Sequence, residues 1–234
     1  MTSDTTNAET TNADTLKAAS VHRRLAVPTR VLLGCGAVAG PLFVLTIAAQ
    51  AMTRDGFDAA RHPLSMLSLG EHGWIQTANF LVSGALVLAS VAGLRRVLAP
   101  GTAGRAWGTR LIAVYGASLV WAGVFPTDPM DGFPAGTPAG AGEVSWHGML
   151  HNLAPVGMGL ALSAACLVFA RRFAREGRRG WTIYSVAAVA VYLVLGLAAF
   201  PAEEFRLMLA GGAVIWTWAA MLSVRFLAEP GGRA

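Results

Sequence analysis

Charged residues are scarce in this sequence. Lys, Arg, Asp and Glu together make up 13% of its 234 residues, about half the roughly 25% that is typical of soluble domains. Apolar residues make up 54%, and the mean hydropathy is +0.52. This composition excludes a water-soluble globule and a disordered chain, because so little charge cannot cover a solvated surface. Lipid is therefore the expected solvent for much of the chain.

Cysteines and the common hydrolase motifs are also scarce or absent. The two cysteines, Cys35 and Cys166, both lie in apolar runs, which excludes a secreted disulfide scaffold. No G-x-S-x-G elbow and no H-E-x-x-H zinc-protease motif occurs, so neither supports a hydrolase assignment.

Six apolar runs are present, and each is long enough to cross about 30 Å of hydrocarbon or nearly so. They are Val31–Met52, Trp74–Leu94, Leu111–Phe125, His147–Ala170, Trp181–Phe200 and Leu207–Leu227. The third is short, and we expect it to borrow Gly108, Thr109 and Arg110, with the Arg110 side chain reaching back to the interface. The sequence predicts an all-α polytopic membrane protein, a six-helix transmembrane bundle over 28–228, because only paired helical backbone is tolerated in lipid.

The segments outside the bundle read as polar tails. Residues 1–27 are polar, lack periodicity and carry Asp4, Glu9 and Asp14 where a signal peptide would be basic. We expect a disordered cytoplasmic tail there and a second short tail at 229–234.

The distribution of basic residues predicts the orientation. Of the 18 Lys and Arg residues, 15 fall in the tails and in the connections after the second and fourth spans, whereas Arg54, Arg61 and Arg206 fall on the other side. By the positive-inside rule both termini are cytoplasmic in a multi-pass protein of the cell membrane. The orientation of the protein in the membrane therefore explains the net charge of +5. We expect membrane lipids as partners and no nucleic-acid binding.

The outer side carries a pair of histidines at helical spacing. His147 and His151 are four residues apart, so their side chains share one helix face. His151 is about 7.5 Å deeper than the interfacial Trp146 at 1.5 Å per residue, and an ionisable group at that depth indicates function. Pro155 frees the carbonyl of His151. The pair is a candidate for catalysis or for a divalent metal, or His151 simply bonds to another helix.

Two further candidate catalytic residues lie in the outer loops. Asp128 follows the third span between Pro126 and Pro129, where partial desolvation would make it a usable acid or base; a turn or capping role is the alternative. Ser65 lies in a short interfacial helix after Pro63 and needs a neighbouring base to act as a nucleophile.

Four residues are candidates for substrate binding. Gln76 and Asn79 lie near the outer end of the second span, where amides also bridge helices. Trp121 and Phe125 end the third span, where their rings could stabilise a cation or anchor the helix at the interface.

The combined pattern resembles a known bacterial family. His62-Pro63-Leu64-Ser65, Leu69-Gly70, Trp74-Ile75-Gln76, Asn79-Phe80, Phe125-Pro126-Thr127-Asp128 and His147 are similar to the six-span membrane family catalogued as domain of unknown function nine-nine-eight. The resemblance covers about residues 30–228 and implies a six-helix integral membrane protein without an established activity.

A looser similarity is to the ceramidase and adiponectin-receptor superfamily of membrane hydrolases. In those proteins an early Ser, an Asp and a late H-x-x-x-H surround zinc. Here Ser65, Asp128 and the pair His147/His151 occur in the same order, although the chain has six predicted spans instead of seven.

These observations favour an intramembrane enzyme that opens to the outer leaflet and acts on a lipid-like or isoprenoid substrate. Hydrolysis by a metal-bound water and acid-initiated cyclisation with Asp128 as the proton donor both stay open. The alternatives are a protein that binds or transports small solutes or lipids, and a structural accessory protein without catalysis.

The charge asymmetry gives a direct test of orientation. Reporter fusions at residues 100 and 175 should report the cytoplasm, and fusions at residues 60 and 135 should report the outside. The reverse pattern would overturn the placement of every candidate site residue on the outer face.

Overall fold

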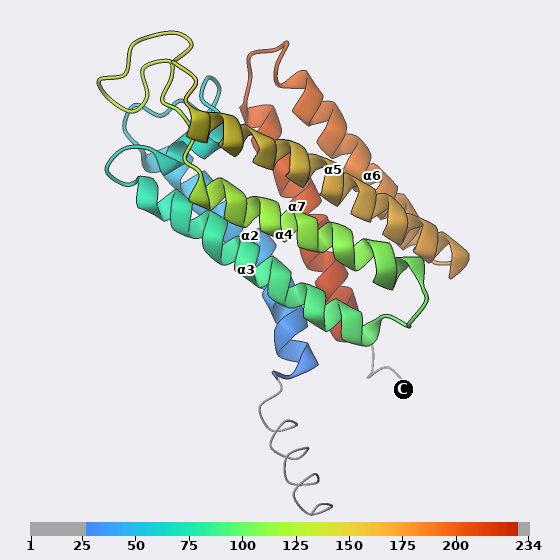
Figure 1. Cartoon of the computed structure of the whole chain (residues 1–234). Helices are drawn as coiled ribbons and strands as arrows, with labels where there is room; N and C mark the ends of the chain where they lie inside the picture. The colour runs from blue at the N-terminus through green and yellow to red at the C-terminus, as the bar shows by residue number, and fades with distance from the viewer. Residues whose placement is uncertain (1–26, 229–234) are drawn as a thin grey trace, which may run out of the picture.

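The computed structural model describes residues 27–228, and within that range it contains six long helices and no strand. They are α2 Thr29–Thr53, α3 Gly73–Val97, α4 Thr109–Val124, α5 Trp146–Arg175, α6 Arg179–Ala198 and α7 Arg206–Ala228 (Figure 1). The predicted all-α polytopic bundle is confirmed. The predicted tails, apart from residue 27, lie outside the described residues.

Five of the helices are long and apolar enough to cross a membrane, all but α4. Helix α4 has 16 residues, but a five-residue π-helix, η2 (Gly104–Gly108), leads directly into it. The 21 residues together rise about 31 Å, which matches the hydrocarbon thickness. The predicted extension of the third span is thus real and longer than expected. At its start the Arg110 guanidinium lies 5.5 Å from the centre of the Trp107 ring.

The helices form a closed ring in which each packs against its neighbours in sequence, and α7 packs against α2 (Figure 1). Six antiparallel passes bring the start of α2 and the end of α7 to the same end of the bundle (Figure 1). We name that end, with the connections 98–108 and 176–178, the arginine-rich end. The opposite end, with the loops 54–72, 125–145 and 199–205, is the histidine-rich end.

Small residues allow the helices to approach closely at two of these contacts. A β-carbon on Gly84 of α3 would lie 2.9 Å from the Gly116 carbonyl oxygen of α4, and one on Gly40 of α2 would lie 2.8 Å from the Trp216 carbonyl oxygen of α7. Without a hydrophobic force between helices in lipid, such close packing supplies the dispersion energy that holds them together. The closing contact between α2 and α7 therefore depends on Gly40.

The two long loops of the histidine-rich end pack on each other through a repeated tripeptide. Asp-Gly-Phe occurs at 55–57 and again at 131–133, and both glycines adopt positive φ, 75° at Gly56 and 85° at Gly132. The Phe57 and Phe133 rings meet edge to face with centroids 5.3 Å apart. An ion pair of 2.8 Å between Arg61 Nη2 and Asp131 Oδ1 joins the same loops.

His62 joins these two loops, and Arg54 fixes the first of them from within. His62 is 3% exposed; its Nδ1 accepts from the Asp58 amide at 3.0 Å, and its Nε2 lies 3.1 Å from the Asp131 carbonyl oxygen. The Arg54 guanidinium donates to the carbonyls of Leu67 and Leu69, and burial lowers its pKa from the usual value. Both nitrogens of His62 are therefore used in the structure.

The glycine contacts predict a contrast between two substitutions. Gly84→Leu should lower the thermal stability of the detergent-solubilised protein by roughly 1–3 kcal/mol, the usual cost of overpacking, because Val120 and Gly116 already occupy the space. Gly34→Leu on α2 meets nothing within 4 Å and should leave the Tm nearly unchanged. Equal losses in both variants would contradict close packing at Gly84.

Candidate functional site

The histidine-rich end of α4 has backbone carbonyls without amide partners. Helix α4 ends at Val124, and the Phe125 amide still pairs with the Trp121 carbonyl at 3.0 Å. Pro126 has no N–H, so the carbonyl of Ala122 lacks the donor four residues on. Buried carbonyls that accept no hydrogen bond cost about 1–3 kcal/mol each, and more in lipid.

Both histidines of α5 bond to the chain that leaves α4. His151 is 1% exposed; its Nδ1 lies 2.7 Å from the Phe125 carbonyl oxygen, and its ring packs edge-on against Phe80. His147 Nδ1 lies 3.1 Å from the Pro126 carbonyl oxygen. Because a carbonyl oxygen only accepts, Nδ1 carries the proton in both rings.

Asp128 contacts His147 and also fixes the start of α5. Its Oδ2 accepts from the Ser145 amide at 2.8 Å, and its Oδ1 accepts from the Ser145 hydroxyl at 2.5 Å. The Ser145 hydroxyl in turn accepts from the Gly148 amide at 3.1 Å, so Ser145 is the N-cap. Asp128 Oδ1 lies 3.7 Å from His147 Nδ1. A β-carbon at Gly148 would overlap the Asp128 carboxylate.

Three aromatic side chains form a row that ends at His147. Trp146 lies 5.7 Å from the His147 ring, Phe125 lies 6.4 Å from Trp146, and Trp121 lies 4.5 Å from Phe125, all between ring centroids. The Trp121 indole also donates to the Leu150 carbonyl at 2.7 Å. Trp121 and Trp146 are exposed, so an apolar aromatic surface lies beside a half-buried imidazole.

Ser65 lies apart from this group. It is part of the 3₁₀-helix η1 (Leu64–Ser68), which packs on α2 and α3. Its carbonyl accepts from the Ser68 hydroxyl at 2.7 Å. Within residues 27–228, no hydrogen bond joins the Ser65 hydroxyl to Asp128, His147 or His151, so the catalytic role of Ser65 stays a prediction without geometric support.

Gln76 and Asn79 lie in a buried amide network between α2 and α3. Gln76 Oε1 accepts from Gln50 Nε2 at 2.9 Å and from Asn79 Nδ2 at 3.3 Å, while Asn79 Nδ2 also donates to the Phe43 carbonyl. Gln50 Oε1 and Gln76 Nε2 are buried and have no hydrogen-bond partner among the described residues. The Phe80 ring, on the same helix as Gln76 and Asn79, contacts both the Phe43 ring and the His151 ring.

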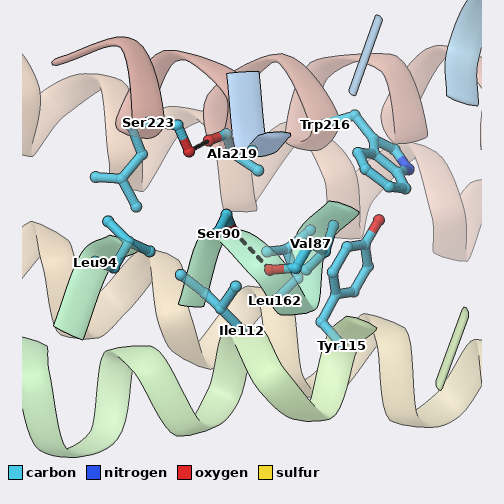
Figure 2. A pocket seen from close by; sticks show the side chains of 11 residues that line it. Val87, Ser90, Leu94, Ile112, Tyr115, Leu162, Trp216, Ala219 and Ser223 are labelled. Atoms are coloured by element: carbon cyan, nitrogen blue, oxygen red, sulfur yellow. Dashed lines mark hydrogen bonds between the residues drawn. The ribbon is translucent and has the colours of Figure 1, made fainter. Parts of the chain in front are cut away.

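A small cavity in the centre of the bundle is lined by hydroxyl groups that the sequence pattern did not single out. It measures about 20 Å³, and its lining includes Tyr115, Ser90, Ser223 and Trp216 (Figure 2). The Ser90 hydroxyl already donates to the Val87 carbonyl at 2.6 Å, and that of Ser223 to the Ala219 carbonyl at 3.3 Å. The space suits one water molecule and is too small for an organic substrate.

The described residues do not form a cluster of candidate metal ligands. Within residues 27–228, no three His, Cys, Asp or Glu side chains lie together as a metal-binding group. Asp128 and His147 are adjacent, whereas His151 turns its Nδ1 to Phe125.

Comparison with protein families matches residues 37–225 to the family described as protein of unknown function (DUF998). No curated protein and no solved structure matches the chain. The looser similarity to membrane ceramidases and adiponectin receptors finds no support in these comparisons.

The hydrogen bonds to the end of α4 predict different costs for the two histidines. His151→Leu should lower the Tm, by about 1–3 kcal/mol in stability, because the Phe125 carbonyl is left buried without a donor. His147→Leu should cost less, since His147 is 34% exposed and water can reach the Pro126 carbonyl. Thermal unfolding in detergent measures both, and a smaller loss for His151→Leu would contradict the assignment.

Proposed function

The chain belongs to the DUF998 family of proteins of unknown function, and we propose that it is an enzyme of the cell membrane with an outward-facing acid–base site. His147 is the general base, and Asp128 orients it. The substrate is a lipid-like molecule that reaches the site laterally, along the aromatic surface of Trp121, Phe125 and Trp146.

One observation carries this proposal: the fixed orientation of the His147 ring. Its Nδ1 faces both the Pro126 carbonyl at 3.1 Å and the Asp128 carboxylate at 3.7 Å, which leaves Nε2 with the free lone pair. Among the described residues no hydrogen-bond partner faces that Nε2. The hydrogen bond from Nδ1 thus goes to the Pro126 carbonyl, and the Asp128 carboxylate lies beside it. An imidazole oriented through Nδ1 near a carboxylate, with an open Nε2, is an arrangement that suits a general base.

The hydrogen bonds of Asp128 favour hydrolysis over cyclisation. Both of its oxygens accept from Ser145, a role that a carboxylate fills and a carboxylic acid fills only in part. A proton-donating Asp128 would have to give up one of these bonds. Removal of a proton from water by His147, with Asp128 stabilising the resulting imidazolium, needs no such change.

The same contacts support a second candidate, an accessory membrane protein without catalysis. His147, His151 and Trp121 each bond a backbone carbonyl of the neighbouring helix segment, which is what a purely structural joint between α4 and α5 would require. The two candidates differ in one respect, because only the enzyme needs the open Nε2 of His147.

The test is a substitution that removes Nε2 of His147 and leaves the protein folded. Membranes containing the overproduced protein are incubated with a total lipid extract of the host, and products are measured by untargeted mass spectrometry. Wild-type protein should change one lipid or amphiphile pool, and His147→Gln should lower that conversion by about 10²-fold or more, the usual contribution of a general base.

His72 supplies the matched control. It lies at the same end of the protein, is exposed, and makes no side-chain capping bond at the start of α3. His72→Gln should therefore convert the pool at the wild-type rate. Equal conversion by wild type and His147→Gln would refute the base, and no pool changed by the wild-type protein would favour the accessory role.

A further inference from the structure

A second cavity lies at the arginine-rich end, remote from the histidines. It has a volume of about 680 Å³, within the range of small-molecule sites, and lies between the connection from α3 to η2 and the last turn of α5. Its lining includes Trp107, Val168, Arg171, Arg172, Arg175 and Glu176.

The charges around this cavity are predominantly positive. Arg171, Arg172 and Arg175 line it, against one carboxylate, Glu176. That carboxylate is already paired with Arg172, whose Nε lies 2.7 Å from Glu176 Oε1. Arg171 and Arg175 are exposed and form no ion pair within the described part of the chain. Their charges are therefore available to an anion.

Arg172 is held in place as part of the cavity wall. Its guanidinium lies 5.6 Å from the centre of the Phe226 ring, and a β-carbon on Gly104 would lie 3.4 Å from its Nη1. Its Nη1 is buried, so Arg172 forms the back of the wall, and Arg171 and Arg175 are the exposed guanidinium groups beside it.

The positive charge continues on the other side of the same connection. A neighbouring cavity of about 320 Å³ is lined by Arg95, Arg105 and Arg110, with no acidic residue among its lining residues. The connection 99–106 therefore has guanidinium groups on both sides.

The apolar walls of the cavity of about 680 Å³ indicate which anion it binds. Trp107 is 59% exposed, and Val168 on α5 contributes a second apolar wall. An exposed indole at the end of a span is typical of the level of the lipid headgroups. A soluble phosphate ion would leave these apolar walls unused, whereas a phospholipid would cover them with its glycerol and acyl segments.

We propose that this cavity binds the phosphate ester of an anionic phospholipid from the leaflet at the arginine-rich end. Arg171 and Arg175 contact the phosphate, and Trp107 and Val168 contact the apolar part of the lipid. Basic pockets between transmembrane helices bind anionic lipid headgroups by this combination.

Native mass spectrometry of the full-length protein in detergent tests the site. Phosphatidylglycerol and phosphatidylcholine are titrated separately, and the bound fraction of each gives its apparent affinity. Wild-type protein should bind phosphatidylglycerol more tightly than phosphatidylcholine. The double variant Arg171→Gln/Arg175→Gln should bind phosphatidylglycerol about tenfold more weakly, since each basic residue contributes to headgroup attraction, with phosphatidylcholine unchanged.

Arg30→Gln/Arg179→Gln is the matched control. Both residues are exposed at the same end, the charge change is identical, and neither lines this cavity. The control should retain wild-type affinity for phosphatidylglycerol. Equal weakening in both double variants would show general charge attraction and overturn the site, as would equal binding of the two lipids by the wild type.

Soluble competitors separate the two sources of phosphate. Inorganic phosphate and glycerol 3-phosphate, added in excess, should leave phosphatidylglycerol bound, because they lack the apolar part. Complete displacement of phosphatidylglycerol by either competitor would overturn the lipid as the ligand. If the double variant Arg171→Gln/Arg175→Gln no longer showed this displacement, the cavity would be assigned to a soluble phosphate ester.

Discussion

In hydrocarbon a backbone carbonyl cannot turn to water, and at the histidine-rich end of α4 this constraint determines the surrounding structure. Pro126 removes an amide from the helix, and the carbonyls of Phe125 and Pro126 lie beyond its last turn. His151 and His147 of α5 supply the donors. The Phe125 carbonyl depends on His151 for its donor, whereas the Pro126 carbonyl, beside the partly exposed His147, is also within reach of water. Asp128, which caps α5 through Ser145, then comes to lie beside His147.

The two ends of the bundle combine polar groups with different degrees of internal pairing. At the histidine-rich end, most polar side chains form hydrogen bonds within the chain. His62 bonds to both long loops, and His151 bonds to the Phe125 carbonyl. His147 is among the exceptions, with one nitrogen engaged and the ring partly exposed. At the arginine-rich end, Arg171 and Arg175 are exposed beside a cavity of about 680 Å³. Functional capacity is thus expected where pairing within the chain is incomplete.

Hydropathy alone predicted the six helices to within a few residues at most ends. The thickness of the bilayer sets the length of each span, and backbone groups in lipid must be hydrogen-bonded within a helix. Hydropathy missed the π-helical turn Gly104–Gly108, since such a turn has no hydropathy signature. The sequence offered Asp128 and His147 as separate candidates, and the structure places Asp128 Oδ1 3.7 Å from His147 Nδ1. Hydropathy could not show that Asn79 bonds to Gln76 and Phe43 while His151 bonds to Phe125, since helix rotation depends on side-chain packing.

The repeated Asp-Gly-Phe was visible in the sequence, but its meaning required the fold. Phe57 and Phe133 contact each other, so the repeat marks two loops that pack together and not a duplicated site. His62, which belongs to the motif that signalled the family, is likewise explained by its bonds to Asp58 and Asp131. A histidine in a motif can be structural, and only the partners of both ring nitrogens distinguish the two cases.

The tautomer of His147 tests the central claim most directly. Nitrogen-15 NMR of histidine-labelled protein in lipid bilayers, assigned with the His147→Gln variant, reports which ring nitrogen carries the proton. The account predicts a neutral ring protonated at Nδ1 with an unprotonated Nε2, because Nδ1 faces the Pro126 carbonyl and Asp128. A neutral ring protonated at Nε2 would contradict both the pairing at the end of α4 and the proposed base.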